Sequence, residues 1–167
     1  MRMKRCLALL LLMLSLFQCC GCQKETPAPQ GTAFYYCAAN ISFDMTSTTI
    51  LAEYRQTPSQ DTLQQMLTKY FAGPASAQLR SPFPVGLKLV EVRQDGQTVH
   101  ITVSDALATL SGLELTLACA CITLTCLDFT GADQVMIYAQ DALLDGQKTI
   151  TMDRDTICLL DTVLEGE

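Results

Sequence analysis

The sequence has little histidine, the side chain that most often acts as a general acid or base. Its 167 residues include no tryptophan and one histidine, His100, and only 17% of them are charged. A serine or thiol enzyme needs a base beside its nucleophile, and no Ser or Cys near His100 in the sequence suggests such a pair. The carboxylates form no recognisable acid–base pair either, and the Asp-Arg-Asp stretch at 153–155 is typical of a solvated turn. We therefore predict that the protein is not an enzyme, with no catalytic residues, no metal and no cofactor.

Positive charge is scarce as well. The chain has 11 basic and 17 acidic residues, and three of the basic residues lie before position 22. A chain that begins at residue 22 keeps eight basic and 17 acidic residues, a formal charge of −9. Such a charge opposes nonspecific binding to nucleic acid and to anionic lipid headgroups. The lack of tryptophan, with most other aromatic residues in core stripes, also disfavours a glycan-binding site.

The N-terminus has the composition of a bacterial export signal. Basic residues within the first five positions precede an apolar stretch at 6–17, which is short for a membrane-spanning helix of roughly 20 residues. Gly21-Cys22 resembles the end of a lipobox, in which cleavage before Cys22 leaves a thioether-linked lipid on that cysteine. Cys19 stands where leucine is usual. An uncleaved anchor and a plain signal peptide are the alternatives, and each of the three exports the domain or holds it at a membrane.

These features divide the chain into four segments. We predict a lipoprotein signal peptide at 1–21, a polar tether at 22–31, a folded domain at 32–152 and a C-terminal extension at 153–167. The length suits one domain and not two. Two or three lipid chains on Cys22 would hold the domain firmly on the outer face of the cytoplasmic membrane.

The run "LTLACACITLTC" at 115–126 carries three cysteines and no charge. On a helix that turns about 100° per residue, Cys119 and Cys126 lie nearly on one line, and Cys121 lies on the other side. On a strand, Cys119 and Cys121 share a face and Cys126 points away. Neither geometry brings three sulfurs to one tetrahedral zinc, so we predict no metal site here.

The same run is too short to cross a bilayer, because Glu114 and Asp128 bracket only 13 uncharged residues. We predict instead a helix over 113–127 that is buried on most sides. A thin polar seam remains along it: Glu114, Cys121, Thr125 and Asp128. Cys121 should be the most exposed cysteine of the run, and the other two should be buried as small apolar residues.

Periodicity and turn signals predict the remaining elements. We expect strands at 32–37 and 47–54, a helix from 57 to 71, a hairpin at 87–104 with His100 on its polar face, and strands at 133–140 and 148–152. The start and stop signals are Thr57-Pro58 with Gln60 for the first helix, Ser111 with Glu114 and Gly131 for the second, and Asp95-Gly96 for the hairpin turn. The order predicts an α+β domain with an open mixed or antiparallel sheet on which two helices pack.

These stretches, in this order, resemble the GerMN domain of bacterial envelope lipoproteins of the sporulation and germination type. The matching stretches are "TAFYY", "LQQMLTKYFAGP", "LRSPFPVGLKLVEVRQDGQTVHITVS" and "LACACITLTCLDFTGADQVMIYAQD", which span about residues 32–142. The resemblance implies an α+β fold related to the ring-building motifs of sporulation complexes. It also implies a noncatalytic role in assembling or stabilising envelope complexes, and it carries no catalytic residues over to this chain.

The sequence thus predicts a lipid-anchored protein-interaction or assembly module of the envelope, with sporulation or germination as its implied setting. Its partner would be an envelope protein or a second copy, not nucleic acid. The binding surface would be an exposed sheet face, a sheet edge or the loop at 75–86. The alternative is an extracytoplasmic ligand- or glycan-binding lipoprotein, which needs a cleft beside an aromatic residue such as Tyr35, Tyr36 or Tyr54.

The redox state of the cysteines is left open by the sequence. Export permits disulfides. Cys37 and Cys158 can pair only if the fold brings their Cα atoms within about 7 Å. The cysteines concerned are Cys37, Cys119, Cys121, Cys126 and Cys158.

Overall fold

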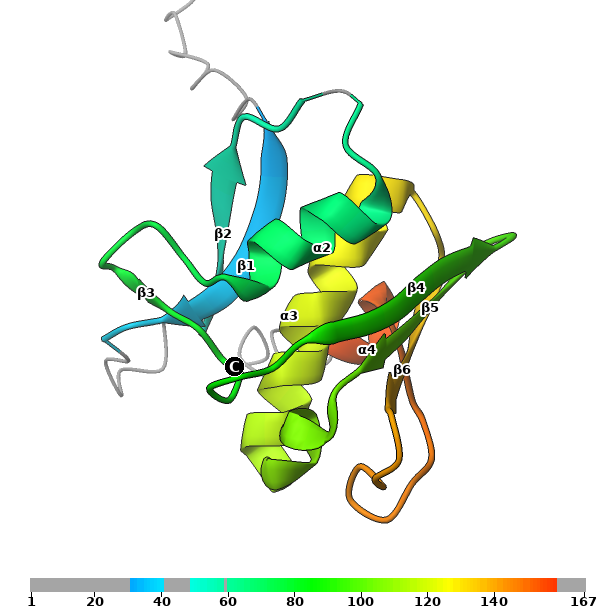
Figure 1. Cartoon of the computed structure of the whole chain (residues 1–167). Helices are drawn as coiled ribbons and strands as arrows, with labels where there is room; N and C mark the ends of the chain where they lie inside the picture. Colours follow the sequence, from blue (N-terminus) through cyan, green and yellow to red (C-terminus); the bar gives the residue numbers. More distant parts are fainter. Residues whose placement is uncertain (1–30, 41–48, 59, 159–167) are drawn as a thin grey trace, which may run out of the picture.

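A long apolar helix, α3 (Gly112–Thr130), runs through the middle of the computed structural model, between two β-sheets (Figure 1). The structure describes residues 31–40, 49–58 and 60–158. Its strands are β1 (Thr32–Ala38), β2 (Ile50–Arg55), β3 (Leu79–Arg80), β4 (Leu89–Asp95), β5 (Thr98–Val103), β6 (Gln134–Ala139) and β7 (Ile150–Asp153). The other helices are α2 (Leu63–Phe71), the 3-10 helix η2 (Asp105–Thr109) and α4 (Arg154–Cys158). The predicted α+β class is confirmed.

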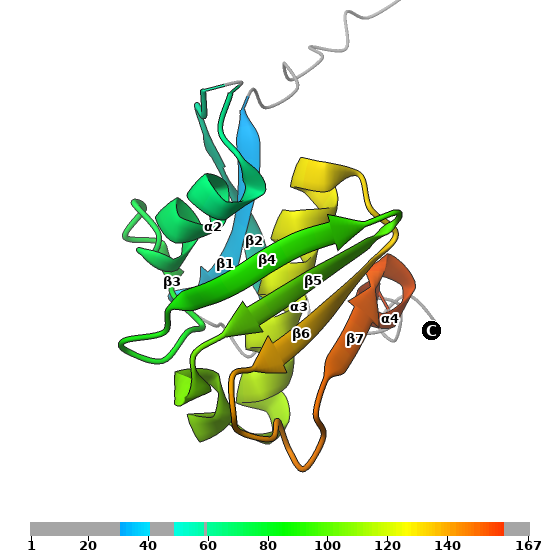
Figure 2. The ribbon, with the colours of Figure 1, turned by 45° about the vertical axis from the view of Figure 1, so that its right-hand side comes forward.

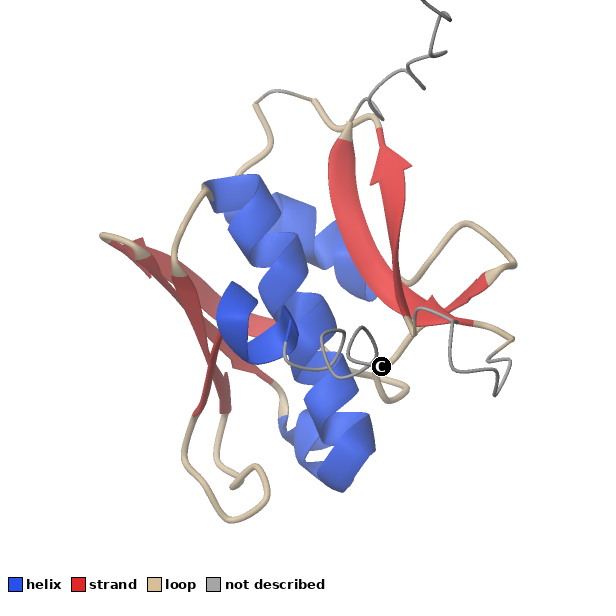
Figure 3. Cartoon of the chain, turned by 180° about the vertical axis from the view of Figure 1, so that it is seen from behind, coloured by secondary structure: helices blue, strands red, loops and turns tan. Residues whose placement is uncertain are grey.

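The strands form two sheets, one on each side of the helices (Figure 3). Sheet A has the order β2-β1-β3 and is antiparallel throughout. Sheet B has the order β4-β5-β6-β7, and its central pair, β5 and β6, is parallel. A parallel pair needs a long crossover connection, and here η2 and α3 provide it. The order of elements predicted one open sheet, whereas the strands separate into two.

Helix α3 is apolar on most of its circumference because protein covers it from two directions. Sheet B presents the fully buried side chains Ile101, Val135 and Ile137, while β1 of sheet A lies against the helix on the other side. Apolar residues all round are typical of a core helix. Among the described residues, only α3 has the length and mean hydropathy of a bilayer span, and more than half of that window is buried inside the domain.

The middle of the predicted polar seam of α3, at Cys121 and Thr125, is covered, while Glu114 and Asp128 at its ends are exposed. The prediction that Cys121 is the most exposed cysteine of the helix is wrong. Cys121 is fully buried, like the other two. Strand β1 lies along the seam, where the N–H of Tyr35 donates to Thr125 Oγ1 at 3.0 Å. Helical periodicity identified the seam correctly, but it could not tell that a strand rather than water would face it.

Side chains satisfy part of the β1 backbone, because the neighbouring strand β3 pairs only with Cys37 and Ala38. Beyond the end of β3, the N–H of Tyr35 donates to Thr125, and the carbonyl of Tyr35 accepts a hydrogen bond from Tyr70 Oη at 2.6 Å. One residue from α3 and one from α2 thus replace a third strand at this position.

Helix α2 begins later than predicted. The spacing Thr-x-x-Gln occurs twice in succession, starting at Thr57 and at Thr62. The second copy forms the capping box: Thr62 accepts a hydrogen bond from the N–H of Gln65, and the Gln65 side chain accepts one from the N–H of Thr62. Thr57 instead bonds to the hydroxyl of Thr32 at the start of β1. The second copy is the cap because the buried stripe of α2 follows it directly.

The ends of α3 lie where the sequence predicts, but the N-terminal cap differs in chemistry. Ser111 occupies the cap position without making a side-chain capping bond, so the predicted capping box with Glu114 is wrong. The N–H of Gly112 donates instead to Asp145 Oδ2 at 2.9 Å, and a carboxylate near a helix N-terminus is also favoured by the helix dipole. Gly131 ends the helix as predicted, with φ 68°.

Candidate functional site

Sheet B has one face that no helix covers among the described residues (Figure 2). The opposite face of the same sheet carries the buried core side chains of β5 and β6. The cross-strand rows on the uncovered side are Glu91–Thr102–Tyr138, Arg93–His100–Met136–Thr151 and Asp95–Thr98–Gln134–Asp153. We call this surface the outer face of sheet B. It is the exposed sheet face that the sequence predicted as a binding surface.

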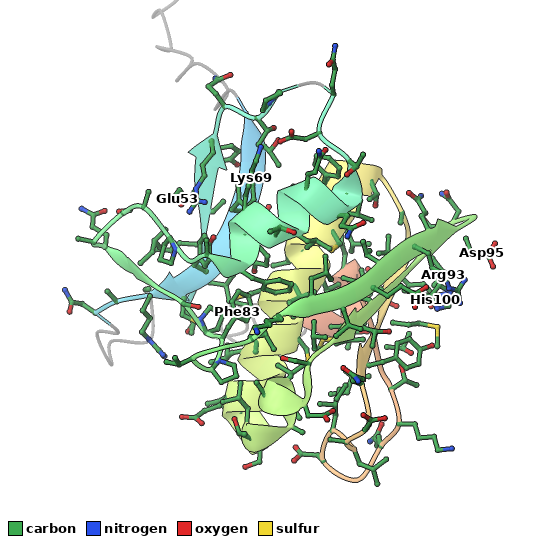
Figure 4. All side chains as sticks on the ribbon, viewed as in Figure 1. Glu53, Lys69, Phe83, Arg93, Asp95 and His100 are labelled. Carbon is green, nitrogen blue, oxygen red and sulfur yellow. The ribbon has the colours of Figure 1, made fainter. Side chains whose placement is uncertain are left out.

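His100 lies near the centre of the outer face of sheet B, on the polar side of its strand, as predicted. Its ring is nearly parallel to that of Tyr138, with ring centroids 6.3 Å apart. Tyr138 Oη lies 3.5 Å from His100 Nδ1 and 3.7 Å from Met136 Sδ. Figure 4 shows Arg93 and Asp95 close to His100 on the β4–β5 hairpin. Their exposed ion pair, at 3.9 Å, contributes little stability.

The outer edges of the two sheets differ in how open they are. Strands β3 and β7 are short, with 2 and 4 residues. Strand β4 alternates in charge and shifts register between Leu89 and Glu91, which discourages pairing with another chain. Strand β2 exposes Leu51 and Tyr54, and no described residue pairs with its outer side. Among these edges, β2 is best suited to accept a partner strand.

A hollow of about 400 Å³ opens beside Tyr54, where the chain enters the domain. Two carboxylates line it, Asp61 and Asp128. Both are engaged, since Asp61 pairs with a lysine of α2, while Asp128 accepts a hydrogen bond from Tyr35 Oη at 2.6 Å and pairs with an arginine of α4. The hollow provides the cleft that the alternative ligand-binding function requires, but its charged groups already have partners.

The start of the proline loop at 75–86 is fastened to β2. Glu53 accepts hydrogen bonds from the N–H groups of Ala75 and Ser76, at 3.1 and 2.8 Å. Burial opposes the ionisation of Glu53, but these bonds and those from Arg55 outweigh it and lower its pKa. This part of the loop is therefore held by charge-assisted hydrogen bonds.

The end of the same loop is held by aromatic packing. The ring of Phe83 meets two rings of α2 edge-on, with both centroid distances at 5.1 Å. Beneath the loop lies a second hollow of about 200 Å³, whose wall includes Cys37, Arg80, Phe83 and Leu117. Glu53 and Phe83 lie at the two ends of this region in Figure 4. The loop is thus a fixed rim around the hollow.

Cys37 and Cys121 bring two thiols into contact beside the second hollow. A hydrogen bond between the thiols lowers the pKa of Cys37 to about 7 and raises the pKa of Cys121. Burial opposes the ionisation of Cys37, whereas the positive charge of Arg80 favours it. Because the thiolate is the nucleophile, the lowered pKa favours the reactive form of Cys37.

The remaining cysteines divide into two groups. Cys119 and Cys126 are buried as predicted, and burial raises the pKa of Cys119 to about 12 and raises that of Cys126 as well. The predicted lipidation site Cys22 lies outside the described residues, as does the side chain of Cys158, the suggested partner of Cys37.

Across the described ranges no three His, Cys, Asp or Glu side chains gather as metal ligands would.

Sequence reasoning found the kinds of surface but missed two contacts. The first is the contact between the rings of His100 and Tyr138. Alternation along 133–140 already placed Met136 and Tyr138 on one side of a strand, so assuming that this strand pairs in parallel with the strand of His100 would have predicted the contact. The contact between Cys37 and Cys121 left no signal in the sequence, because the two residues lie on separate elements, far apart in the chain.

One comparison with known proteins gives a match. A family model described as Germane, sporulation and spore germination, matches residues 33–145. The match covers about two-thirds of the chain and runs from β1 through β6, nearly the span of 32–142 over which the sequence resembles the GerMN domain. No curated protein and no solved structure matches the chain.

Proposed function

The chain belongs to the Germane family of sporulation and spore germination, and from this we propose that it is a lipid-anchored, noncatalytic interaction module of the GerMN type. Family membership gives it a role related to sporulation or germination. The observation that carries the interaction role is the uncovered outer face of sheet B. Arg93, Met136 and Tyr138 on that face belong to the residue types enriched at protein interfaces.

A noncatalytic role is supported by where the reactive side chains lie. His100 contacts Tyr138 on the outer face of sheet B. Cys37 lies on β1 of sheet A, with α3 between the two sheets. A thiol enzyme needs these two groups within hydrogen-bond reach of each other. This separation of His100 and Cys37 favours a protein that binds a partner through its surface over one that catalyses a reaction.

We place the protein on the outer face of the cytoplasmic membrane, held by lipid on Cys22. The expected result is that cells fed a clickable palmitate analogue label the wild-type protein, which stays with membranes after an alkaline wash. The Cys22→Ala variant should take up no label and keep residues 1–21. The matched variant Cys20→Ala should be labelled and cleaved like the wild type. Label on the Cys22→Ala protein, or none on the wild type, would contradict the anchor.

The partner that we propose is an envelope protein or a second copy of this chain. Since the chain from residue 22 has a formal charge of −9, a basic patch on the partner would complement it. The outer face of sheet B would provide the side-chain contacts, and the open edge of β2 could add backbone hydrogen bonds. Arginine and tyrosine at the centre of an interface often carry most of its binding energy.

Charge reversal on the outer face tests this role. Crosslinking in intact sporulating cells, followed by mass spectrometry, should join the wild-type protein to an envelope protein or to itself. Arg93→Glu should reduce that crosslink by roughly tenfold, because an interface arginine is often worth more than 1 kcal/mol. Lys148→Glu makes the same charge change on an exposed turn and should leave the crosslink unchanged. Equal crosslinking of both variants, or a monomer with no copurifying protein at any salt, would refute the role.

Ligand or glycan binding is the second candidate function, and the hollow beside Tyr54 favours it. Tyr54 is 45% exposed and could stack on a ligand ring. Binding of soluble cell-wall fragments to the wild-type protein, lost in Tyr54→Ala, would support this function over the first.

A further inference from the structure

Cys37 and Cys121 lie opposite each other where β1 crosses α3, because two residues of a strand and four residues of a helix span nearly the same length. Tyr35 and Cys37 are two residues apart on β1, a rise of about 6.6 Å. Thr125 and Cys121 are four residues apart on α3, a rise of about 6 Å. Tyr35 bonds to Thr125 at 3.0 Å, so the next pair in this register is Cys37 and Cys121.

Of the two cysteines, Cys37 lies nearer to the outside of the core, and local opening at the second hollow would expose its thiol. Both residues are fully buried, but Cys37 forms part of the wall of the second hollow, beneath the loop at 75–86. Arg80 lines the same hollow and adds a positive charge beside Cys37. Cys121 stands against Cys37 on the core side. A thiol at the wall of a hollow, with a second thiol behind it, is the arrangement expected of an attacking and a resolving cysteine.

We propose that Cys37 and Cys121 form a redox-active dithiol, which a low-molecular-weight disulfide converts into an intramolecular disulfide between β1 and α3. The choice of these two cysteines stands on the geometry alone. Formation of the bond in cells rests also on the proposed location outside the cytoplasm, because exported proteins keep disulfides, whereas cytosolic thiols are held reduced.

The exchange proceeds in two steps. The Cys37 thiolate attacks one sulfur of the small disulfide RSSR, which forms the mixed disulfide Cys37–S–S–R and releases RS⁻. Cys121 then loses its proton to RS⁻, attacks Cys37 Sγ and expels the second RS⁻, which takes up the proton that Cys37 gave to solvent. The two protein thiols lose two electrons and two protons, and RSSR gains them to become two RSH. The lowered pKa of Cys37 supports its role as the attacking thiol.

The disulfide would join the middle strand of sheet A to the helix on which sheet B packs. It would close a loop between Cys37 and Cys121 that contains β2, α2 and the β4–β5 hairpin. Closing so long a loop reduces the freedom of the unfolded chain, so we expect the oxidised form to melt roughly 10 °C higher than the dithiol form.

The test uses the full-length protein, purified in detergent and equilibrated with reduced or oxidised glutathione. Each sample is quenched in acid, unfolded, alkylated, digested and mapped by mass spectrometry. The oxidised sample should lose two alkylatable thiols and yield a crosslinked peptide that joins Cys37 to Cys121. Its Tm should rise by roughly 10 °C. Alkylated Cys37 and Cys121 after equilibration with oxidised glutathione, or a link that uses another cysteine, would overturn the proposal.

Matched variants separate the roles of the two thiols. Cys121→Ser removes only the resolving thiol and should trap glutathione on Cys37 as a stable mixed disulfide. Cys119→Ser removes another buried thiol of α3 and should still form the link between Cys37 and Cys121. The wild-type peptide map tests the proposal without any variant, so poor folding of a serine variant does not affect that test.

A second peptide map, from cells quenched in acid at harvest, distinguishes this proposal from the proposed location. A link found both in glutathione and in cells supports both. A link found in glutathione and not in cells supports the dithiol alone, because export permits a disulfide without requiring one; the location is then judged by the palmitate labelling of Cys22. The interaction role is judged separately, by the crosslinking of the Arg93→Glu variant.

Discussion

Replacing Tyr70 with alanine is expected to lower the free energy of unfolding by about 4 kcal/mol. The ring of Tyr70 is fully buried, with its centroid 5.8 Å from that of Phe34, 5.0 Å from that of Tyr36 and 5.1 Å from that of Phe83. Its hydroxyl also bonds to the carbonyl of Tyr35 at 2.6 Å. Alanine would leave a large cavity where α2, β1 and the proline loop meet, and would leave the partly buried carbonyl of Tyr35 without this partner.

The matched variant Tyr70→Phe keeps the ring and removes only the hydroxyl. We expect it to cost about 1–2 kcal/mol, the usual penalty for leaving a buried carbonyl without its donor. Urea unfolding followed by circular dichroism measures both variants. Equal losses for the two variants would mean that the hydroxyl, and not the ring, holds α2 on β1. A loss below 1 kcal/mol for alanine would show that this aromatic cluster does not form the core described here.

Replacing Glu53 with glutamine is expected to cost about 2 kcal/mol at neutral pH, because hydrogen bonds to a charged acceptor are the strong ones. The carboxylate is 13% exposed. It accepts from Arg55 Nε at 2.7 Å and from the N–H groups of Ala75 and Ser76, at 3.1 and 2.8 Å. Glutamine keeps one acceptor oxygen, but it loses the negative charge and some of these hydrogen bonds. The loop at 75–86 should also become more accessible to proteases.

The pH dependence of this effect follows from the lowered pKa of Glu53. Hydrogen bonds from Arg55, Ala75 and Ser76 outweigh the effect of burial and favour the charged form in the folded state. The contribution of Glu53 is therefore complete above its unfolded pKa of about 4.3, and it is lost as the pH falls below that value. The stability difference between the wild type and Glu53→Gln should be largest at pH 7 and shrink toward pH 3.

An exposed glutamate provides the control for this measurement. Glu91 lies on the edge strand β4, and Glu91→Gln should change the free energy of unfolding by less than about 0.5 kcal/mol at either pH. Urea unfolding at pH 7 and at pH 3 gives both differences. If the difference in the free energy of unfolding between the wild type and Glu53→Gln is the same at pH 7 and pH 3, the charge of Glu53 does not strengthen its hydrogen bonds. The loss would then come from a steric effect of the amide.

Local signals predicted the elements well, because each depends on residues within one or two turns of the chain. The stripe that follows Thr62, the Asp95-Gly96 turn, the alternation around His100 and the stop at Gly131 all appear in the structure. The start of α2 shows where local signals stop being sufficient. Two equal Thr-x-x-Gln patterns competed, and packing of the apolar stripe against β1 selected the second.

The candidate surfaces were predictable in kind but not in composition. Alternation showed that His100 points away from the core, and the structure confirms this. It could not show that Met136, Tyr138 and Arg93 surround it, because that depends on strand order and on the parallel register of β5 and β6. The same limit applies to α3, where periodicity found a polar seam at Cys121 and Thr125 but not the strand that covers it.

The sequence by itself determined the α+β class and the longer helices and strands, because these follow from composition and from periodicity among neighbouring residues. The family followed from the likeness of whole stretches of the chain to known members. Only the tertiary structure decided that α3 lies between two sheets, that Cys121 meets Cys37, and that one face of sheet B stays uncovered in the described chain. These contacts join residues far apart in the chain. The hydrophobic periodicity of a single helix or strand shows which of its sides is buried, but not which other element covers that side.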